Sequence, residues 1–226
     1  MTKDRLYLDQ ADGLSRRSVQ TVMYHMYNYL LGMLAPLTPM LVEEAWEHTP
    51  EALKRDAIHP LRRLYPTAPE LWRNESLEAV LPLFLRAKEA VNAAQERLRL
   101  DKQIGSSLES VITLSFPASN SELYTVFQAY EPELEALFVT SKLTLVLESE
   151  GQEQPTTTDG PIDCVASATF GLDSRVEAAV HAHSVKYMQP PKSKCARCWR
   201  HAAPADVDED RALCGRCMRV VEQCHT

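Results

Sequence analysis

Glycine is scarce in this sequence, and long apolar runs are absent. Only 7 of the 226 residues are Gly, and neither G-x-G-x-x-G nor G-x-x-x-x-G-K occurs, so the sequence carries no glycine-rich phosphate loop of the nucleotide-binding kinds. No apolar run approaches the roughly 20 residues that span a bilayer. The first residues are mixed polar and acidic, which fits neither a secretory signal nor an Arg-rich transit peptide. We therefore expect no membrane span and no address label in the sequence as given.

The overall composition is average for a globular chain, but the charge is unevenly distributed. Hydrophobic residues make up 45% of the sequence and charged residues 24%. Residues 1–101 hold 13 basic and 14 acidic side chains, residues 102–191 hold 4 and 12, and residues 192–226 hold 7 and 5. The acidic middle would repel a phosphate backbone. A nucleic acid is therefore expected to bind through the first helices and the C-terminal tail.

The first hundred residues carry the apolar spacing of helices. Between residues 16 and 35 apolar side chains recur every three or four positions, which predicts a helix with one buried face and with Ser15 as its N-cap. The Thr-Pro pair at residues 38–39 predicts the cap and first turn of a short helix that runs to Trp46. A third helix is predicted from about residue 77 to 101. We expect the methionines and aromatic residues of these stripes to pack in the core.

From residue 104 to about 190 the apolar period changes from 3.6 to 2, which predicts half-buried strands. The four alternating segments are residues 108–116, 141–147, 162–170 and 176–182. Short helices are predicted at residues 121–130 and 133–137, and residues 151–160 predict a solvated loop. This part of the chain is therefore expected to form a small α+β unit.

The C-terminal tail contains two C-x-x-C pairs. Cys195 and Cys198 form the first pair, Cys214 and Cys217 form the second, and fifteen residues separate the two pairs. This spacing lets two tight turns present four thiolates to one tetrahedral zinc ion. Because sulfur would fill all four coordination positions, the ion would be structural and would activate no water. Nearby Lys and Arg side chains favour the deprotonated ligands.

Alternatives remain open for some of these side chains. His201 and Cys224 lie close enough in sequence to replace one of the ligands. A redox role for one C-x-x-C pair would leave the other pair without a role, so we consider it the weaker interpretation. Cys164 lies on the apolar phase of a predicted strand and is expected to be an inert core thiol.

The expected fold class is therefore α+β with several domains. We predict an α-helical bundle at residues 1–103, a small α+β junction domain at residues 104–190, and a C-terminal zinc ribbon at residues 191–226. The first two predictions rest on the change of apolar period, and the third on the cysteine spacing.

The tail and the helical region together resemble one enzyme family. Residues 194–199 with residues 214–217 look like the C-terminal zinc finger of bacterial and organellar isoleucyl-tRNA synthetases, a finger also shared with a family of DNA-repair glycosylases. The segments that resemble the helical anticodon-binding domain of the same synthetases are residues 4–7, 16–17, 20–22, 34–39 and 43–46. Residues 90–109 resemble the segment that follows that domain. These matches occur in the order of the synthetase and cover nearly the whole chain.

The resemblance implies tRNA recognition without catalysis by this chain alone. A class I synthetase of this kind carries an H-x-G-H signature, a K-M-S-K-S loop and an editing domain, and none of these is present in the sequence. The resemblance implies binding of isoleucine tRNA around the anticodon, with one structural Zn²⁺, while ATP would be needed only in a full-length enzyme. The implied partners are tRNA(Ile) and the catalytic part of the synthetase. The implied location is the cytoplasm or the mitochondrial matrix.

Five residues are candidate RNA contacts under this interpretation. Arg16 and Arg17, at the N-terminal end of the first predicted helix, are candidates for phosphate binding. Trp199, with Arg197 and Arg200, is a candidate beside the anticodon, because RNA loops are read by stacking bases on aromatic rings.

Plainer interpretations of these residues and two other functions stay open. Adjacent arginines are often a solvated helix face, and Trp199 could simply pack over the zinc site. The chain could also be a stand-alone zinc-ribbon module that binds protein, or a DNA-binding finger protein. Binding to tRNA and to duplex DNA would separate these functions.

Overall fold

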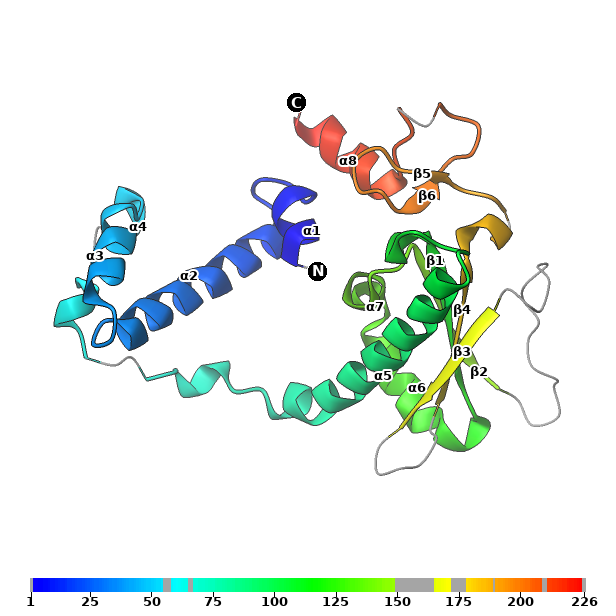
Figure 1. The fold of residues 1–226 in the computed structure, drawn as a ribbon, viewed down its shortest axis with the longest axis horizontal. Helices are drawn as coiled ribbons and strands as arrows, with labels where there is room; N and C mark the ends of the chain where they lie inside the picture. The colour runs from blue at the N-terminus through cyan, green and yellow to red at the C-terminus, as the bar shows by residue number, and fades with distance from the viewer. Residues whose placement is uncertain are drawn as a thin grey trace. The chain divides into compact units, whose positions relative to one another are not determined.

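The computed structural model describes residues 2–54, 58–64, 67–148, 165–171, 178–188, 190–208 and 211–224. The chain divides into two compact units, a helical unit of residues 4–74 and a second unit that begins at Glu75. The elements of the helical unit (Figure 1) are α1 (Thr2–Tyr7), α2 (Leu14–Leu34), α3 (Pro39–Glu47), α4 (Glu51–Lys54) and the 3-10 turns η1 (Pro60–Arg62) and η2 (Glu70–Trp72). No helix in the described ranges is both long and apolar enough to cross a membrane.

The two longer predicted helices of the helical unit are present, with small differences at their ends. α2 begins at Leu14, so its N-cap is Gly13 and the prediction of Ser15 as the cap is wrong. α3 begins at Pro39 with Thr38 at the cap position, as predicted. The Thr38 hydroxyl, however, donates to the Leu34 carbonyl at 3.4 Å and does not cap α3. Proline fits the first helical position because its missing N–H has no intrahelical partner there.

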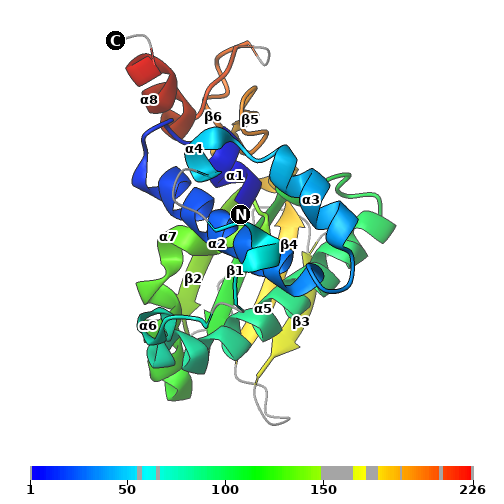
Figure 2. The ribbon, with the colours of Figure 1, turned by 90° about the vertical axis from the view of Figure 1, so that its left-hand side faces the viewer.

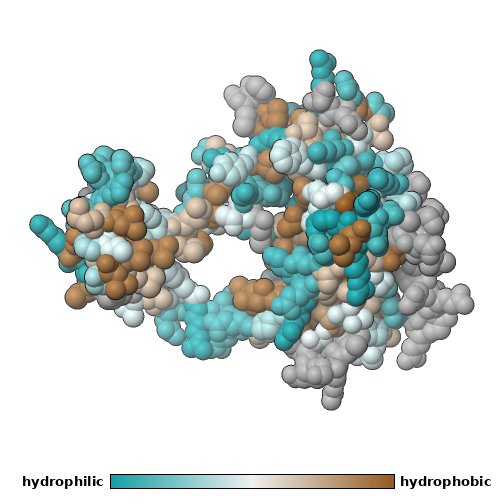
Figure 3. Space-filling model, viewed as in Figure 1, coloured by the Kyte–Doolittle hydropathy of each residue, from teal (hydrophilic) through white to brown (hydrophobic). Residues whose placement is uncertain are grey.

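The apolar stripe of α2 is largely exposed. Leu31 is the buried residue of α2, whereas Val22 is 58%, Met26 57% and Leu30 49% exposed. The expectation that this stripe packs in the core is therefore wrong for these residues, and hydrophobic side chains lie at the surface of this unit (Figure 3). The physical reason is the small number of elements that pack on α2 here, mainly α3 and η1.

The second unit contains one long helix, a sheet and a C-terminal finger (Figure 1). Its helices and 3-10 turns are α5 (Glu75–Leu100), η3 (Ser107–Glu109), η4 (Ala118–Asn120), α6 (Ser121–Ala129), α7 (Glu131–Phe138), η6 (Val185–Tyr187) and α8 (Gly215–Cys224). Its strands are β1 (Ser110–Phe116), β2 (Lys142–Leu147), β3 (Val165–Phe170), β4 (Ala178–Ser184), β5 (Ser193–Lys194) and β6 (His201–Ala203). The predicted mixture of helix and sheet is thereby confirmed.

β1 to β4 form one mixed sheet in the order β2-β1-β4-β3. β1 and β2 are parallel, while β4 is antiparallel to both β1 and β3. The register pairs Ile112 with Leu143 and with Ala182, so that the apolar phases of the strands share one face. The four predicted strands therefore exist. Cys164 and the predicted loop at residues 151–160 lie outside the described residues.

Helices α5, α6 and α7 cover that apolar face (Figure 2). α5 packs on β3 and β4, and α6 and α7 pack on the β2 side of the sheet. Aromatic rings join the layers at Phe127, whose centroid lies 4.9 Å from that of Phe84, 5.2 Å from Phe116 and 5.7 Å from Phe170. Such edge-on and tilted pairs stabilise a core beyond the area they bury.

The packing of α5 bears on the domain organisation. α5 falls within the predicted helical domain of residues 1–103, and in the structure it belongs to the compact unit that contains the sheet. The three predicted domain ranges, residues 1–103, 104–190 and 191–226, stay a prediction.

Candidate metal centre and RNA-binding surface

The first C-x-x-C pair forms a hydrogen-bonded knuckle at the end of β5. The Trp199 N–H donates to the Cys195 carbonyl at 2.9 Å, and the Cys195 N–H donates to the Arg200 carbonyl at 2.9 Å. The second pair lies at the start of α8, where the Cys214 N–H donates to the Cys195 sulfur at 3.4 Å. These local turns aim both pairs at one point.

The structure brings the four cysteine sulfurs together. All four Sγ atoms lie within 4.8 Å of one another, and Cys198 Sγ is 3.7 Å from Cys214 Sγ. Four sulfurs at about 2.3 Å from a central tetrahedral ion would be about 3.8 Å apart, so this arrangement fits a metal ion. Cys195 and Cys217 are fully buried and Cys214 nearly so, which protects the site from solvent.

Burial and mutual repulsion make these thiols hard to ionise together. Burial raises the pKa of Cys198, and the neighbouring sulfurs raise it further. Burial likewise raises the pKa of Cys217 to about 11, with Cys214 contributing. For Cys195 burial also raises the pKa, but backbone N–H groups of Cys198, Cys214 and Arg197 outweigh burial and lower it to about 6. One thiolate is thus favoured by the fold, and a bound cation would stabilise the other three.

The cluster in the described part of the chain consists of these four cysteines, and His201 is not a member. The backbone N–H of His201 instead donates to Ser141 Oγ at 2.7 Å. The Cys224 side chain is outside the described residues. A closed set of four sulfurs leaves no coordination position for a substrate or a reactive water. The arrangement can therefore hold structure together but offers no metal-based catalysis.

Trp199 is the exposed aromatic residue of the finger. Its side chain is 63% exposed and its φ is +65°, a left-handed conformation that is uncommon for a bulky residue. Lys194 Nζ lies 5.6 Å from the centre of the indole ring, within the range of a cation–π contact. The finger therefore presents a largely exposed aromatic ring with an adjacent cation.

The predicted RNA-binding residues fall in two groups. Arg197, Trp199 and Arg200 lie together in the knuckle loop of the finger. Arg200 is turned toward the body of its unit, since its Nη1 donates to Glu135 Oε2 of α7 at 3.2 Å. Arg16 and Arg17 lie in the first turn of α2, where Arg17 is exposed and Arg16 is half-buried.

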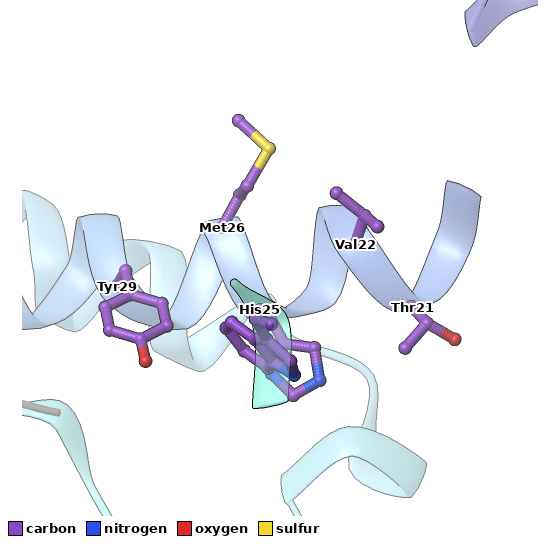
Figure 4. A pocket seen from close by; sticks show the side chains of 6 residues that line it. Thr21, Val22, His25, Met26 and Tyr29 are labelled. Carbon is purple, nitrogen blue, oxygen red and sulfur yellow. The ribbon is translucent and has the colours of Figure 1, made fainter. Parts of the chain in front are cut away.

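An apolar groove along α2 was not predicted from the sequence. It has a volume of about 470 Å³ and is lined by Thr21, Val22, His25, Met26, Tyr29 and Trp72 (Figure 4). The His25 and Trp72 rings meet edge to face with centroids 4.6 Å apart. Helical periodicity could have placed His25 and Tyr29 on one face, but Trp72 comes from η2, which no local pattern connects to α2.

The chain matches the family model for the anticodon-binding domain of tRNA ligase over residues 1–115. The chain belongs to this family. Among curated relatives, the isoleucine–tRNA ligase of Staphylococcus aureus is 33% identical over 226 residues, that of Natranaerobius thermophilus 32% over 220, and that of Symbiobacterium thermophilum 29% over 222. Each match covers 97% of this chain. The resemblance inferred from the motifs is confirmed.

The chain spans about a fifth of the length of the curated relatives it matches, 21% in each case. Because each match covers 97% of this chain, the matched part of the chain extends well past residue 115.

Proposed function

We propose that this chain recognises isoleucine tRNA around its anticodon and that one structural Zn²⁺ holds its finger. The single observation that carries the proposal is the match of residues 1–115 to the anticodon-binding domain of tRNA ligase. The similarity to isoleucine–tRNA ligases over 97% of the chain supports the choice of this tRNA.

Zinc is the proposed metal because the donor set consists of four thiolates. Soft sulfur ligands in a tetrahedral arrangement favour zinc or iron–sulfur chemistry, and one compact four-sulfur site with this spacing is typical of zinc ribbons. The proposed ligands are Cys195, Cys198, Cys214 and Cys217, which the fold already gathers within 4.8 Å. When bound, the ion would add to the small buried cluster of the finger, which besides the cysteines contains Ala203 and Ala212.

The proposed RNA contacts divide by chemistry. Arg16 and Arg17 would bind phosphate groups, as basic side chains at the surface of RNA-binding proteins do. Trp199 would stack on an unpaired base of the anticodon loop, since its ring is exposed and fixed at its backbone. Arg197, beside Trp199, would add a further phosphate contact.

We assign no catalytic residue to this chain. Aminoacylation would require the ATP-binding and catalytic part of a tRNA ligase, as the remaining length of the relatives suggests. The proposed partners are thus tRNA(Ile) and that catalytic part. The proposed location is wherever translation takes place, in the cytoplasm or the mitochondrial matrix.

Competition binding tests the proposal. The affinity of the purified chain is measured for isoleucine tRNA, for an unrelated tRNA and for duplex DNA at several salt concentrations between about 50 and 200 mM. We expect tighter binding to isoleucine tRNA than to the other two ligands at every salt concentration. Equal binding to all three would support a general nucleic-acid-binding finger instead, and no binding to any would support a protein-interaction module.

A further inference from the structure

The finger is attached to the α+β body by a charged contact. Arg200 Nη1 donates to Glu135 Oε2 at 3.2 Å, and the Arg200 side chain is only 12% exposed. The other carboxylate oxygen of Glu135 accepts a hydrogen bond from the Leu143 N–H at 3.4 Å. Glu135 therefore joins α7, the start of β2 and the finger through its two oxygens.

A second contact lies one residue further along the finger. The His201 N–H donates to Ser141 Oγ at 2.7 Å, and the Ser141 hydroxyl donates in turn to the Leu108 carbonyl. Ser141 is buried and lies directly before β2. The two residues that follow Trp199 are thus both held by the body of the unit, one through its side chain and one through its backbone.

Trp199 lies between these two contacts and the cysteine site. On its N-terminal side the Trp199 N–H is bound to the carbonyl of Cys195, a proposed metal ligand. On its C-terminal side Arg200 and His201 are bound to Glu135 and Ser141. The backbone of Trp199 is therefore constrained on both sides while its ring is 63% exposed. A rigid aromatic ring loses little conformational entropy when a base stacks on it.

We propose that Glu135 and Ser141 are positioning residues for RNA recognition, and that Arg200 acts as the link to Glu135 and not as a phosphate ligand. This inference rests on the proposed function, because it assumes that Trp199 contacts RNA. It gives the α+β body a role: α7 and β2 fix the direction in which the finger presents its aromatic ring.

The two possible roles of Arg200 predict opposite effects of removing the Glu135 charge. If Arg200 bound phosphate, Glu135→Gln would remove a competing anion from the guanidinium and a negative charge near the RNA, so the affinity would rise. If Arg200 positions the finger, Glu135→Gln weakens its anchor and the affinity falls. The sign of the change decides between them.

The test measures the affinity of the full chain for isoleucine tRNA in four variants. We expect Glu135→Gln to weaken binding about two- to fivefold, the range for a partly exposed ion pair. Glu131→Gln, the matched control, changes the same charge on the same helix at an exposed position and should not weaken binding. Ser141→Ala should also weaken binding. The exchange of both charges, Glu135→Arg with Arg200→Glu, should recover most of the affinity lost by Glu135→Gln.

A spectroscopic readout separates positioning from general destabilisation. Trp46 and Trp72 are replaced by Phe so that Trp199 is the remaining tryptophan of the chain. Glu135→Gln should then increase the mobility of Trp199, seen as a lower fluorescence anisotropy, while the bound metal and the unfolding temperature of the body stay unchanged. Unchanged anisotropy, or a gain in RNA affinity, would overturn the inference.

The failure of this inference can be told apart from failure of the proposed function. If Trp199→Ala weakens RNA binding but Glu135→Gln does not, the finger contacts RNA and the positioning role alone is refuted. If Trp199→Ala leaves the affinity unchanged, Trp199 does not contact RNA. The positioning inference is then refuted, and the proposed function loses Trp199 as an RNA contact.

Discussion

α2 and α5 carry the same kind of apolar stripe and differ in how it is buried. α2 has one buried residue among 21, although its methionines and leucines follow helical spacing. α5 buries a continuous face consisting of Phe84, Ala87, Ala90, Val91, Ala94, Gln95 and Leu98. The difference lies in the partner: α5 packs on β3 and β4, whereas within its own unit α2 packs mainly on the short elements α3 and η1. Periodicity thus specifies which face of a helix is apolar, and only tertiary partners decide whether it is buried.

The largest expected effect concerns the finger, whose core is a small cluster of buried residues that includes three of the cysteines. Cys195→Ser or Cys214→Ser should abolish metal binding and unfold residues 192–224, because the binding free energy of a structural zinc ion, about 10–16 kcal/mol at neutral pH in small fingers, is their folding free energy. Helix content in the rest of the chain should persist. Metal analysis and circular dichroism measure both effects, with Cys164→Ser as the control. Full metal content in both variants would contradict the four-thiolate assignment.

A matched pair of truncations tests the contrast between the two kinds of helix. Phe127→Ala should lower the free energy of unfolding of its unit by about 3–5 kcal/mol, because the ring is fully buried against three other aromatic rings. Met26→Ala, at 57% exposure, should change stability by less than about 0.5 kcal/mol. Denaturant unfolding followed by circular dichroism measures both. A large loss for Met26→Ala would mean that the α2 stripe is covered in solution.

Acid should release the metal before it unfolds the body of the second unit. Metal binding displaces protons from thiols, and burial raises the pKa of Cys198 and of Cys217, the latter to about 11. Protons therefore compete more strongly as the pH falls, and the metal affinity decreases with decreasing pH. A chelator titration between about pH 5 and 8 would show this. An affinity that is constant over that range would argue against thiolate ligands.

The smallest predicted effect concerns phosphate contacts in the helical unit. Arg17→Ala should reduce the slope of log affinity against log salt by about 1 and weaken binding to every tRNA alike, since a phosphate contact carries no sequence information. Arg86→Ala removes an exposed arginine from α5, where it pairs with Glu89, and serves as the control. Equal slopes for both variants would indicate that Arg17 belongs to a solvated helix face.

Much of the fold could be predicted because local patterns determine its elements. α3, α6 and α7 were predicted to within a few residues, since Pro39 and the apolar spacing act locally. β5 and β6 were missed because strands of two or three residues have no detectable period. The burial of α2 was predicted wrongly because it depends on partners distant in sequence.

The candidate metal site could be predicted from the sequence, because all four cysteines lie in one short segment and their spacing is typical of a zinc site. The contacts that orient the finger could not be found in this way. Glu135 and Arg200 are 65 residues apart, and each is an ordinary surface charge when read alone. Only the structure shows that α7 and the finger pair through them.

Chemical probing of the anticodon loop tests the central claim most directly. Isoleucine tRNA is probed base by base with and without the metal-loaded chain. We predict protection of the anticodon loop that disappears when the metal is chelated and is reduced by Trp199→Ala. Protection confined to the acceptor end, or a pattern unaffected by chelation and by Trp199→Ala, would contradict the account.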